Sequence, residues 1–598
     1  MFTEAPQHSN NSNMRDRFCK FVIIIILSYI TRSFSGHFWH ISDLHIDYSY
    51  VVGGNISDHC RKSQDKAANV TEQELVGPAG NYHCDSPLVL AMSALDAMKK
   101  IHGDPDFILW TGDSAPHWNT PASPDMTYIM NVTQTVFTEL EHLFPGVPII
   151  PALGNHDVSP TNQFPISTAE DPSPEYYSSL LEHGGWLPHV PEGESVRTFK
   201  KCGYYAKTFQ TTQNMTMKFL ILNTNIYLHD KLASGEDPCE QLAWLNQTIA
   251  QANASNELLY IVSHVPPKFQ FNTPKQFSEE IHDRYMKIIT NSDNSNKICA
   301  HIYAHYHSDT FEIFLDEDRG NKIRGVAFIG SSVSPVTGVN PGIRLFSFDN
   351  VDGTLLDYDQ YYLDLQYLNE KFDIITQNGE NEKTNKTVYV SSFDDDVKNN
   401  EALTNQIGLI KDYVSHPSFT KHYTGFLAKK WKLLYKATQA FSIPRLSKDY
   451  MFEAFTTMVQ DGANSSMFGD YCAHSTLSHV ARCGEDVWRK MLCTVTSMGE
   501  REQERCLEGT GRNGFQGFKT SKPINNSTIA VSPTPTHAND LDSNDIFIVV
   551  SSILFIFVVT LLLSVLYYRN QRENLEDTEQ VLLTDSDFQY GGLHLEYE

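Results

Sequence analysis

The sequence predicts an α/β fold in which polar side chains gather at the ends of strands. Five short apolar runs, rich in β-branched residues, are typical of buried strands, and the stretches 88–100 and 241–251 have the apolar spacing of helices. Each apolar run ends in side chains that can bind a metal: Asp43 and His45, then Asp113, then Asn155 and His156, then His264, then His305 and His307. Ligands bind beyond the carboxyl ends of strands in open α/β sheets, so five such ends in one sheet would bring these side chains together.

This set of side chains has the chemistry of a divalent metal centre. Imidazole, carboxylate and amide groups suit zinc, iron and manganese. Any single member would mean little, because Asp and Asn at strand ends are common turn residues and a lone His is usually a core or loop residue. Repetition over five runs favours a metal site. Seven candidate ligands exceed the needs of one tetrahedral ion, so we expect two ions.

The order D-x-H, G-D, G-N-H-D, H and H-x-H resembles that of the calcineurin-like metallophosphoesterases. The strings WTGDSAPH, PALGNHD, LNTN, SHVPP and NPGIRLF are similar to one branch of that superfamily, the acid sphingomyelinase-like phosphodiesterases, over roughly residues 37–510. The resemblance implies a four-layer α/β/β/α sandwich, which we assign to 37–365. Helix-length segments with grouped cysteines then predict a smaller helical, disulfide-bonded C-terminal domain over 366–510.

The resemblance also implies a role for each polar residue. The expected ligands of one zinc ion are Asp43, His45, Asp113 and His307. Those of the second are Asp113, Asn155, His264 and His305, so that Asp113 bridges two Zn²⁺ per chain. A hydroxide between the ions is the implied nucleophile, and the non-ligand residues His117 and His156 bind a phosphoryl oxygen or protonate the leaving group. Pro116 stands where the iron–zinc variant of the superfamily has a tyrosine ligand, which favours zinc.

Two positions near the predicted ligands need separate comment. Asp157 either orients His156 or caps and turns the backbone of its loop, and the sequence leaves both open. Ala304 stands where the family motif Gly-His-x-His has glycine. Alanine tolerates a positive φ poorly, so metal affinity would suffer if the turn needs glycine. Because both histidines of the motif are kept, we expect a modest effect and an active enzyme.

Two apolar segments predict the topology of the chain. Basic residues precede the short run 21–30 and small residues follow it, as in a signal peptide, which we place at 1–36. Segment 546–568 is long and apolar enough to cross a bilayer, and Arg569 and Arg572 follow it. We therefore expect a single-pass type I membrane protein, with a Ser/Thr/Pro-rich stalk (511–545), a cytosolic tail (569–598), and an ectodomain outside the cell or in the endosomal or lysosomal lumen.

Cysteines and glycosylation sequons agree with an oxidising compartment. Cys60 and Cys84 are close enough in sequence to close a loop, and the resemblance implies the pairs Cys472–Cys483 and Cys493–Cys506. Cys202, Cys239 and Cys299 are left over, so at least one thiol stays free or pairs between chains. Expected glycosylation sites are Asn55, Asn69, Asn131, Asn214, Asn246, Asn253, Asn385, Asn464 and Asn526.

Charge and length narrow the function. A net charge of −26 disfavours binding to duplex nucleic acid. The first metal motif follows the predicted cleavage site so closely that the saposin module of true acid sphingomyelinases does not fit between them. We therefore predict a zinc-dependent phosphodiesterase that acts on phosphodiester or pyrophosphate bonds of extracellular or luminal nucleotides or related small molecules. The alternatives are a sphingomyelin phosphodiesterase acting on phospholipid and an inactive relative that binds lipid or a partner.

Overall fold

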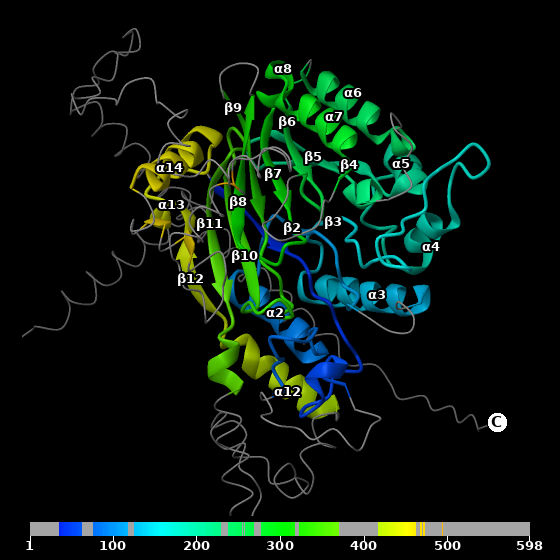
Figure 1. Cartoon of the computed structure of the whole chain (residues 1–598), viewed down its shortest axis with the longest axis vertical. Coiled ribbons are helices and arrows are strands. Elements are labelled where there is room, and N and C mark those ends of the chain that lie inside the picture. The colour runs from blue at the N-terminus through cyan, green and yellow to red at the C-terminus, as the bar shows by residue number, and fades with distance from the viewer. Residues whose placement is uncertain are drawn as a thin grey trace, which may run out of the picture. The chain divides into compact units, whose positions relative to one another are not determined.

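Two mixed β-sheets form the centre of the protein (Figure 1). The computed structural model describes residues 35–61, 76–117, 125–228, 237–253, 255, 257–267, 277–316, 322–369 and 417–461, with a few further positions up to residue 495. The first sheet has six strands, in the order β12 (Lys432–Lys436), β11 (Leu355–Tyr362), β10 (Gly342–Asp349), β1 (Ser35–Ile41), β2 (Phe107–Trp110) and β3 (Ile149–Pro151). β1, β2 and β3 run parallel, while β10, β11 and β12 are antiparallel to their neighbours.

The second sheet also has six strands and a parallel centre. Its order is β4 (Tyr205–Gln210), β5 (Thr216–Ile221), β6 (Glu257–Val262), β7 (Ile298–Tyr303), β9 (Lys322–Ile329) and β8 (Thr310–Asp316). Only the two edge strands, β4 and β8, pair antiparallel with their neighbours. The central strands are apolar and buried over most of their length, which is typical of parallel strands covered on both faces.

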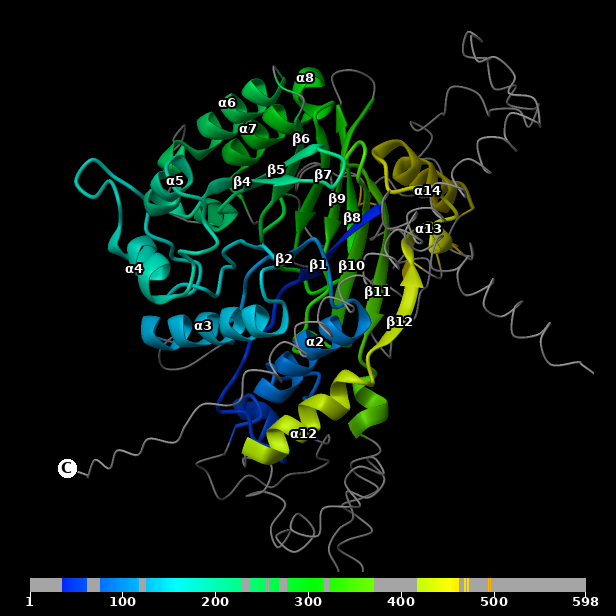
Figure 2. The same ribbon diagram turned by 180° about the vertical axis from the view of Figure 1, so that it is seen from behind.

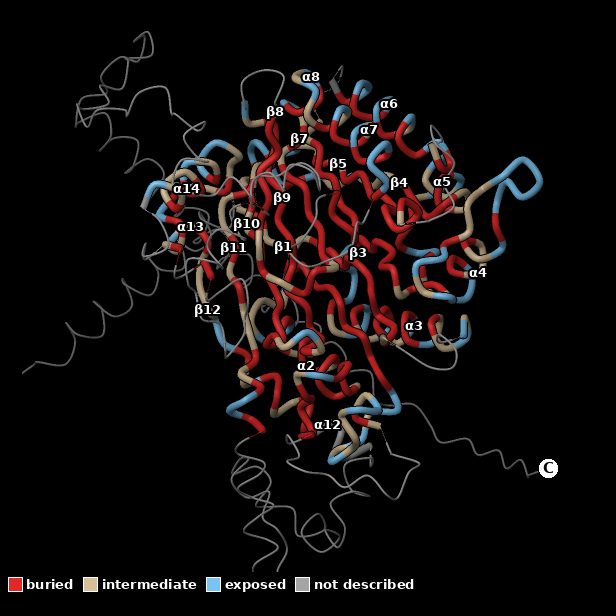
Figure 3. The backbone as a smooth tube through the Cα atoms, viewed as in Figure 1, coloured by how far each residue is buried: buried red, intermediate tan, exposed pale blue. Residues whose placement is uncertain are grey.

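Aromatic side chains fill the space between the sheets. The ring of Phe107 on β2 lies 5.0 Å from that of Phe219 on β5, and Phe328 on β9 lies 5.9 Å from Phe346 on β10, measured between centroids. Figure 3 shows the central strands as mostly buried, whereas the edge strands β4 and β12, the helices and the loops carry more exposed residues. These contacts bury large aromatic surfaces and fix how the sheets face each other.

Helices cover the outer face of each sheet (Figures 1 and 2). α2 (Leu88–Ile101) and α3 (Met126–Leu143) lie on the side of the first sheet, and α6 (Gln241–Asn253), α7 (Glu279–Thr290) and α8 (Ser292–Ser295) lie on the side of the second. α2 and α6 confirm the helices predicted at 88–100 and 241–251. The shorter elements before β4 and around the second sheet are η1 (Ile56–Asp58), α4 (Glu175–His183), α5 (Glu194–Cys202), η2 (Thr224–Leu228) and η3 (Pro238–Glu240).

The described part of the C-terminal region does not stand apart from the sheets. β12 pairs with β11, α12 (Pro417–Ala428) packs on α2, and α13 (Ala437–Ala440) and α14 (Lys448–Asp461) contact β11 and β9. The sequence led us to expect a helical domain at 366–510, and the described part of that range contains the helices α12, α13 and α14 together with one strand, β12, that we did not expect. The pattern KLLYK is too short to be told from a helix segment, and only its partner β11 makes it a strand.

The structure contradicts the predicted single-pass type I membrane location. Among the helices that the structure describes, none is both long and apolar enough to cross a bilayer. The segment on which that prediction rested, 546–568, lies outside the described residues, as do the stalk 511–545 and the tail 569–598. Residues 1–34 of the predicted signal peptide also lie outside them, and its predicted end at residue 36 falls within β1.

Candidate metal centre

The carboxyl ends of five strands meet at one place, but they belong to two sheets. β1, β2 and β3 of the first sheet and β6 and β7 of the second each end just before predicted ligands. The two sheets agree with the α/β/β/α sandwich that the resemblance implies, and the simpler picture of five strand ends in one sheet does not hold. Neighbouring strands lie about 4.8 Å apart, so five ends in one sheet would spread over about 19 Å, whereas two facing sheets lie about 10 Å apart and bring their ends together.

The first group of ligating atoms comes from Asp43, His45 and His307, all of which are buried. His45 Nε2 lies 3.1 Å from His307 Nε2. Asp43 Oδ1 lies 3.3 Å from His307 Nε2 and 3.8 Å from His45 Nε2. Two imidazole nitrogens and a carboxylate oxygen thus face one point from β1 and β7.

The second group is built around the side-chain oxygen of Asn155. Asn155 Oδ1 lies 3.0 Å from His264 Nε2 and 2.8 Å from His305 Nδ1. The amide nitrogen of Asn155 donates to Asn162 Oδ1, which directs the oxygen toward the two histidines. Asp113, His264 and His305 also place one ligating atom each within 4.8 Å of one another.

One oxygen of Asp113 lies between the two groups. Asp113 Oδ2 is 3.5 Å from His45 Nε2 and 3.1 Å from His264 Nε2. The other oxygen, Oδ1, accepts the backbone N–H of His156 at 2.7 Å. The backbone of one loop therefore turns the carboxylate of the next so that a single oxygen faces both groups.

Hydrogen bonds fix which nitrogen of two histidines faces the centre. Nδ1 of His45 donates to the carbonyl oxygen of Ala115 at 2.8 Å, and Nδ1 of His264 donates to that of Thr111 at 2.7 Å. A proton on Nδ1 leaves Nε2 with a free lone pair in the neutral ring. Such carbonyl partners are the usual support of metal-binding histidines.

The donor set fits divalent cations. Asp43 is fully buried, and neither of its carboxylate oxygens has a hydrogen bond among the described residues. Burying an ionised carboxylate is costly unless positive charge lies beside it, which here is either a proton on His307 or His45 or a bound cation. Burial acts to raise the pKa of Asp43, but His307 and His45 outweigh burial and hold that pKa well below its usual range. The carboxylate thus stays ionised.

The pKa values of two of the four histidines also respond to these carboxylates, whereas burial lowers the pKa of His305 and of His307. Burial opposes protonation of the other two as well, yet Asp43 and Asp113 raise the pKa of His45 to about 9, and Asp113 raises that of His264 to about 9. Two buried carboxylates therefore draw positive charge onto the nitrogens that face the centre. A bound cation would take the place of these protons.

Strained backbone accompanies the ligands. φ is positive at Asp43 (51°), His45 (40°), Asp113 (55°), His305 (73°) and His307 (58°). Such conformations are unfavourable for residues with a Cβ atom and are found at functional sites where the surroundings hold them in place. In the H-x-H segment the positive φ falls at His305 rather than at Ala304, so the turn does not require glycine at position 304.

The two predicted non-ligand histidines lie on the more exposed side of the centre. One nitrogen atom each of His45, His117 and His156 lies within 4.8 Å of the others, and the rings of His117 and His156 are 4.2 Å apart. His117 and His156 are partly exposed, whereas His45 is buried. Their proximity alone would also allow a role as ligands, and metal analysis of variants distinguishes the two roles.

Asp85 is a site residue that the sequence analysis missed. Its carboxylate oxygens accept from His117 Nδ1 at 2.8 Å and from the His117 backbone N–H at 2.6 Å. Asp85 follows Cys84, which forms a disulfide with Cys60. No apolar run precedes this aspartate, and its position beside a cysteine was the only available signal.

The sequence left two roles open for Asp157, and the structure shows the second, in which its carboxylate binds backbone N–H groups. One of its oxygens accepts the N–H groups of Gly154 (2.8 Å) and Asp113 (3.0 Å), and the other accepts that of Ser114 (2.9 Å). The carboxylate thus ties the loop after β2 to the loop after β3. No described hydrogen bond links it to the ring of His156.

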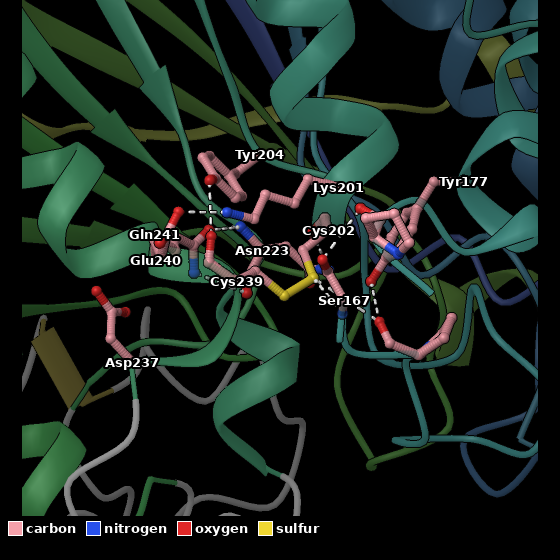
Figure 4. Close-up of a disulfide and its surroundings, with 12 residues drawn as sticks. Ser167, Tyr177, Lys201, Cys202, Tyr204, Asn223, Asp237, Cys239, Glu240 and Gln241 are labelled. Atoms are coloured by element: carbon pink, nitrogen blue, oxygen red, sulfur yellow. Dashed lines mark hydrogen bonds and ion pairs between the residues drawn. A yellow bond between two sulfur atoms is a disulfide. The ribbon is translucent and has the colours of Figure 1, made fainter. Parts of the chain in front are cut away.

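The LNTN motif supports the loop after β3 from the second sheet. Asn225 donates to the carbonyl oxygen of Leu153 at 2.6 Å and to Asn223 Oδ1 at 2.9 Å. Asn223 in turn donates to the carbonyl oxygen of Cys202, which forms a disulfide with Cys239 (Figure 4). This buried network ends next to Gly154 and Asn155, so it helps to fix the amide ligand.

The remaining cysteines and sequons divide between described and undescribed residues. Cys299 is a free thiol. Cys472 and Cys493 are disulfide-bonded, while Cys483 and Cys506, their expected partners, lie outside the described residues. Asn131, Asn214 and Asn246 are exposed, Asn55 is half-buried and Asn253 ends α6. The sequons outside the described residues are Asn69, Asn385, Asn464 and Asn526.

Comparison with known proteins agrees with this geometry. The family model for calcineurin-like phosphoesterases matches residues 36–309. The Mus musculus protein named cyclic GMP-AMP phosphodiesterase SMPDL3A is 35% identical over 56% of this chain and 73% of its own length. Acid sphingomyelinase-like phosphodiesterase 3b of Mus musculus is 34% identical over 81% of this chain and 92% of its own. Sphingomyelin phosphodiesterase of Bos taurus is 28% identical over 55% and 52% respectively.

Proposed function

The chain belongs to the acid sphingomyelinase-like phosphodiesterases, a branch of the calcineurin-like phosphoesterases, and from this premise we propose that it hydrolyses phosphodiester or pyrophosphate bonds of nucleotides with two zinc ions. The observation that carries the proposal is Asp113 Oδ2, which lies 3.5 Å from His45 Nε2 and 3.1 Å from His264 Nε2. A carboxylate oxygen between two groups of ligating nitrogens suits a pair of ions better than a single one.

We assign four ligands to each ion, with Asp113 common to both. The ligands of the first ion are Asp43, His45, Asp113 and His307, and those of the second are Asp113, Asn155, His264 and His305. Zinc bound there supplies Lewis acidity that activates the attacking water and screens the phosphoryl charge. Buried Pro116, in place of a tyrosine, supports zinc over an iron–zinc pair.

We assign proton transfer to the two partly exposed histidines, His117 and His156. Asp85 fixes the ring of His117 through Nδ1, so Nε2 remains for a phosphoryl or leaving-group oxygen. As water adds to phosphorus and the ester oxygen leaves, a protonated ring can give that oxygen its proton. His156 lies beside it, and its backbone N–H keeps Asp113 in position. Six of the seven assigned ligands are buried, whereas the rings of His117 and His156, like the ligand His305, are partly exposed.

The names of the relatives cover both substrate classes, and we place nucleotides first because three relatives at 34–35% identity are named for a cyclic dinucleotide. Two relatives are named for sphingomyelin or sphingomyelinase: one of Bos taurus is 28% identical over about half of its length, and one of Dictyostelium discoideum is 33% identical over 77% of its own. A cyclic dinucleotide, ATP and a linear dinucleotide share a phosphodiester or pyrophosphate bond and differ in what flanks it. Sphingomyelin cleavage is the second candidate, favoured by these two relatives.

A substrate screen on the purified full chain tests the proposal. Cyclic GMP-AMP, ATP, a linear dinucleotide and sphingomyelin are supplied side by side with zinc, and the products are separated and quantified. We expect nucleotide turnover that Asp113→Asn abolishes. Hydrolysis of sphingomyelin alone would support the second candidate function instead. No hydrolysis of any of the four substrates by a zinc-loaded preparation would contradict both candidate functions.

A further inference from the structure

A buried ionic network lies directly behind the H-x-H segment. Asp309 follows His307 by two residues, and only 2% of its surface is exposed. Its Oδ1 accepts a hydrogen bond from Nη2 of Arg344 on β10, and its Oδ2 accepts one from the hydroxyl of Tyr435 on β12 at 2.5 Å. Both oxygens of this carboxylate are therefore held by strands of the first sheet, although Asp309 itself leads into β8 of the second.

Arg344 is held firmly enough to act as an anchor. It is 1% exposed, its Nε donates to Gln360 Oε1 at 2.9 Å, and its guanidinium carbon lies 4.1 Å from the centre of the Tyr358 ring. The hydroxyl of Tyr358 in turn lies 2.9 Å from that of Tyr435. Contacts with a carboxylate, an amide and an aromatic face hold the guanidinium in one position, so it can fix the carboxylate of Asp309.

The H-x-H segment needs such an anchor. His305 and His307 both have positive φ, 73° and 58°, and the segment between β7 and β8 is short. At its start, the N–H of Ala304 donates to the carbonyl oxygen of His264 at 2.9 Å. At its end, Asp309 makes the buried contacts described above. Strained ligand conformations persist only where the surrounding structure holds both ends.

We propose that Arg344 and Tyr435 are positioning residues of the metal centre, which hold His307 in place through Asp309. The inference rests on the proposed two-metal function. Arg344 lies in the NPGIRLF string and Tyr435 in the C-terminal strand β12, both beyond residues 36–309 that match the calcineurin-like model. The C-terminal region thus completes the support of a centre whose ligands all lie before residue 310.

The expected effect is on metal retention. Loss of outer-shell partners of metal ligands typically lowers metal affinity about 10–100-fold. Tyr435→Phe removes one hydrogen bond to Asp309 and keeps the ring, so we expect metal loss to a chelator to be about tenfold faster. Arg344→Lys keeps the charge and loses the planar fork that reaches Asp309 and Gln360 together, so its effect should be at least as large.

The experiment uses the full chain loaded with Co²⁺, whose visible absorption reports the geometry of the bound ion. The rate of absorption loss in excess EDTA is measured for wild type, Tyr435→Phe, Arg344→Lys and Asp309→Asn, along with the thermal unfolding midpoint. Tyr260→Phe is the matched control. Tyr260 is fully buried, whereas Tyr435 is half-buried, so Tyr260→Phe is the more disruptive change for the fold. The Tyr260 hydroxyl donates to the carbonyl oxygen of Gly353 at 2.5 Å, without contact to Asp309.

We expect faster loss of about half of the bound cobalt in Tyr435→Phe and Arg344→Lys, and the wild-type rate in Tyr260→Phe. Wild-type rates in both network variants would overturn this inference and leave the proposed function standing. Equal acceleration in Tyr260→Phe would show general loosening of the fold and would also overturn it. A wild-type chain that binds no cobalt or zinc would overturn the inference and the two-metal function together.

Discussion

His117 and Asp85 are joined at two points, since Asp85 accepts both the Nδ1–H and the backbone N–H of His117. Burial acts to raise the pKa of Asp85, but His117 outweighs burial and lowers that pKa to about 2. The disulfide of the preceding Cys84 with Cys60 fixes the loop that carries this carboxylate. The ring of His117 is therefore oriented by a fixed, ionised partner.

Asp85→Asn should lower kcat and leave metal content near normal. An asparagine oxygen can accept one of the two hydrogen bonds, so the loss should be smaller than that caused by removal of His117. Steady-state kinetics and metal analysis on the same preparation measure both. A variant with wild-type kcat, or one that has lost its metal, would show that Asp85 does not act by orienting His117.

His117→Ala and His156→Ala should each lower kcat by about 10²–10⁴-fold, the usual range for a general acid or base. Neither is assigned as a ligand, so bound zinc should stay close to the wild-type amount. Because both rings lie within reach of His45, zinc content is the discriminating measurement. If replacing either histidine removes one zinc ion, that histidine is a metal ligand.

Ala304→Gly should leave kcat/KM within about twofold of wild type. The positive φ lies at His305, and Ala304 is fully buried with its N–H bonded to His264, so glycine relieves no strain there. The cost is at most the added freedom of the unfolded chain, about 0.5–1 kcal/mol. A large gain in activity would mean that the methyl group restrains the site, contrary to this geometry.

The strand ends and the grouping of their polar side chains were predictable because they depend on local pattern. An apolar run that stops at Asp43 or His264 carries its own signal. The resemblance implies two sheets, but the apolar runs themselves do not show how the five strands divide between them, because pairing such as that of β7 with β9 depends on the whole fold. That division is what brings the ligands within reach of one another.

Residues that support the ligands were harder to predict. Asp85 acts on His117 across 32 residues, and Asp309 meets Tyr435 across 126. No periodicity links such positions, and each member alone resembles an ordinary polar residue of a loop or strand. The sequence also could not show whether the turn needs glycine at position 304. It shows that alanine replaces glycine there, but not that the positive φ falls at His305.

Acid should destabilise the fold in part through His301 on β7. Burial lowers the pKa of His301 to about 3 from an ordinary value of 6.5. Between these values the unfolded chain binds a proton that the folded chain does not, so the free energy of unfolding falls as pH falls below 6.5, by at most about 1.4 kcal/mol per pH unit. His301→Leu should therefore show a smaller drop in Tm between pH 7 and pH 5 than wild type. Equal drops would exclude this histidine as a cause.

The zinc content of the purified full chain, measured beside its phosphodiesterase activity, tests the two-metal account most directly. Asp113 Oδ2 faces both ligand groups, so wild type should carry close to two zinc ions per chain. Asp113→Asn removes the charge that both ions share, and it should lose zinc and all measurable activity. An active preparation with one zinc ion or none, or an Asp113→Asn variant that keeps its activity, would contradict the account.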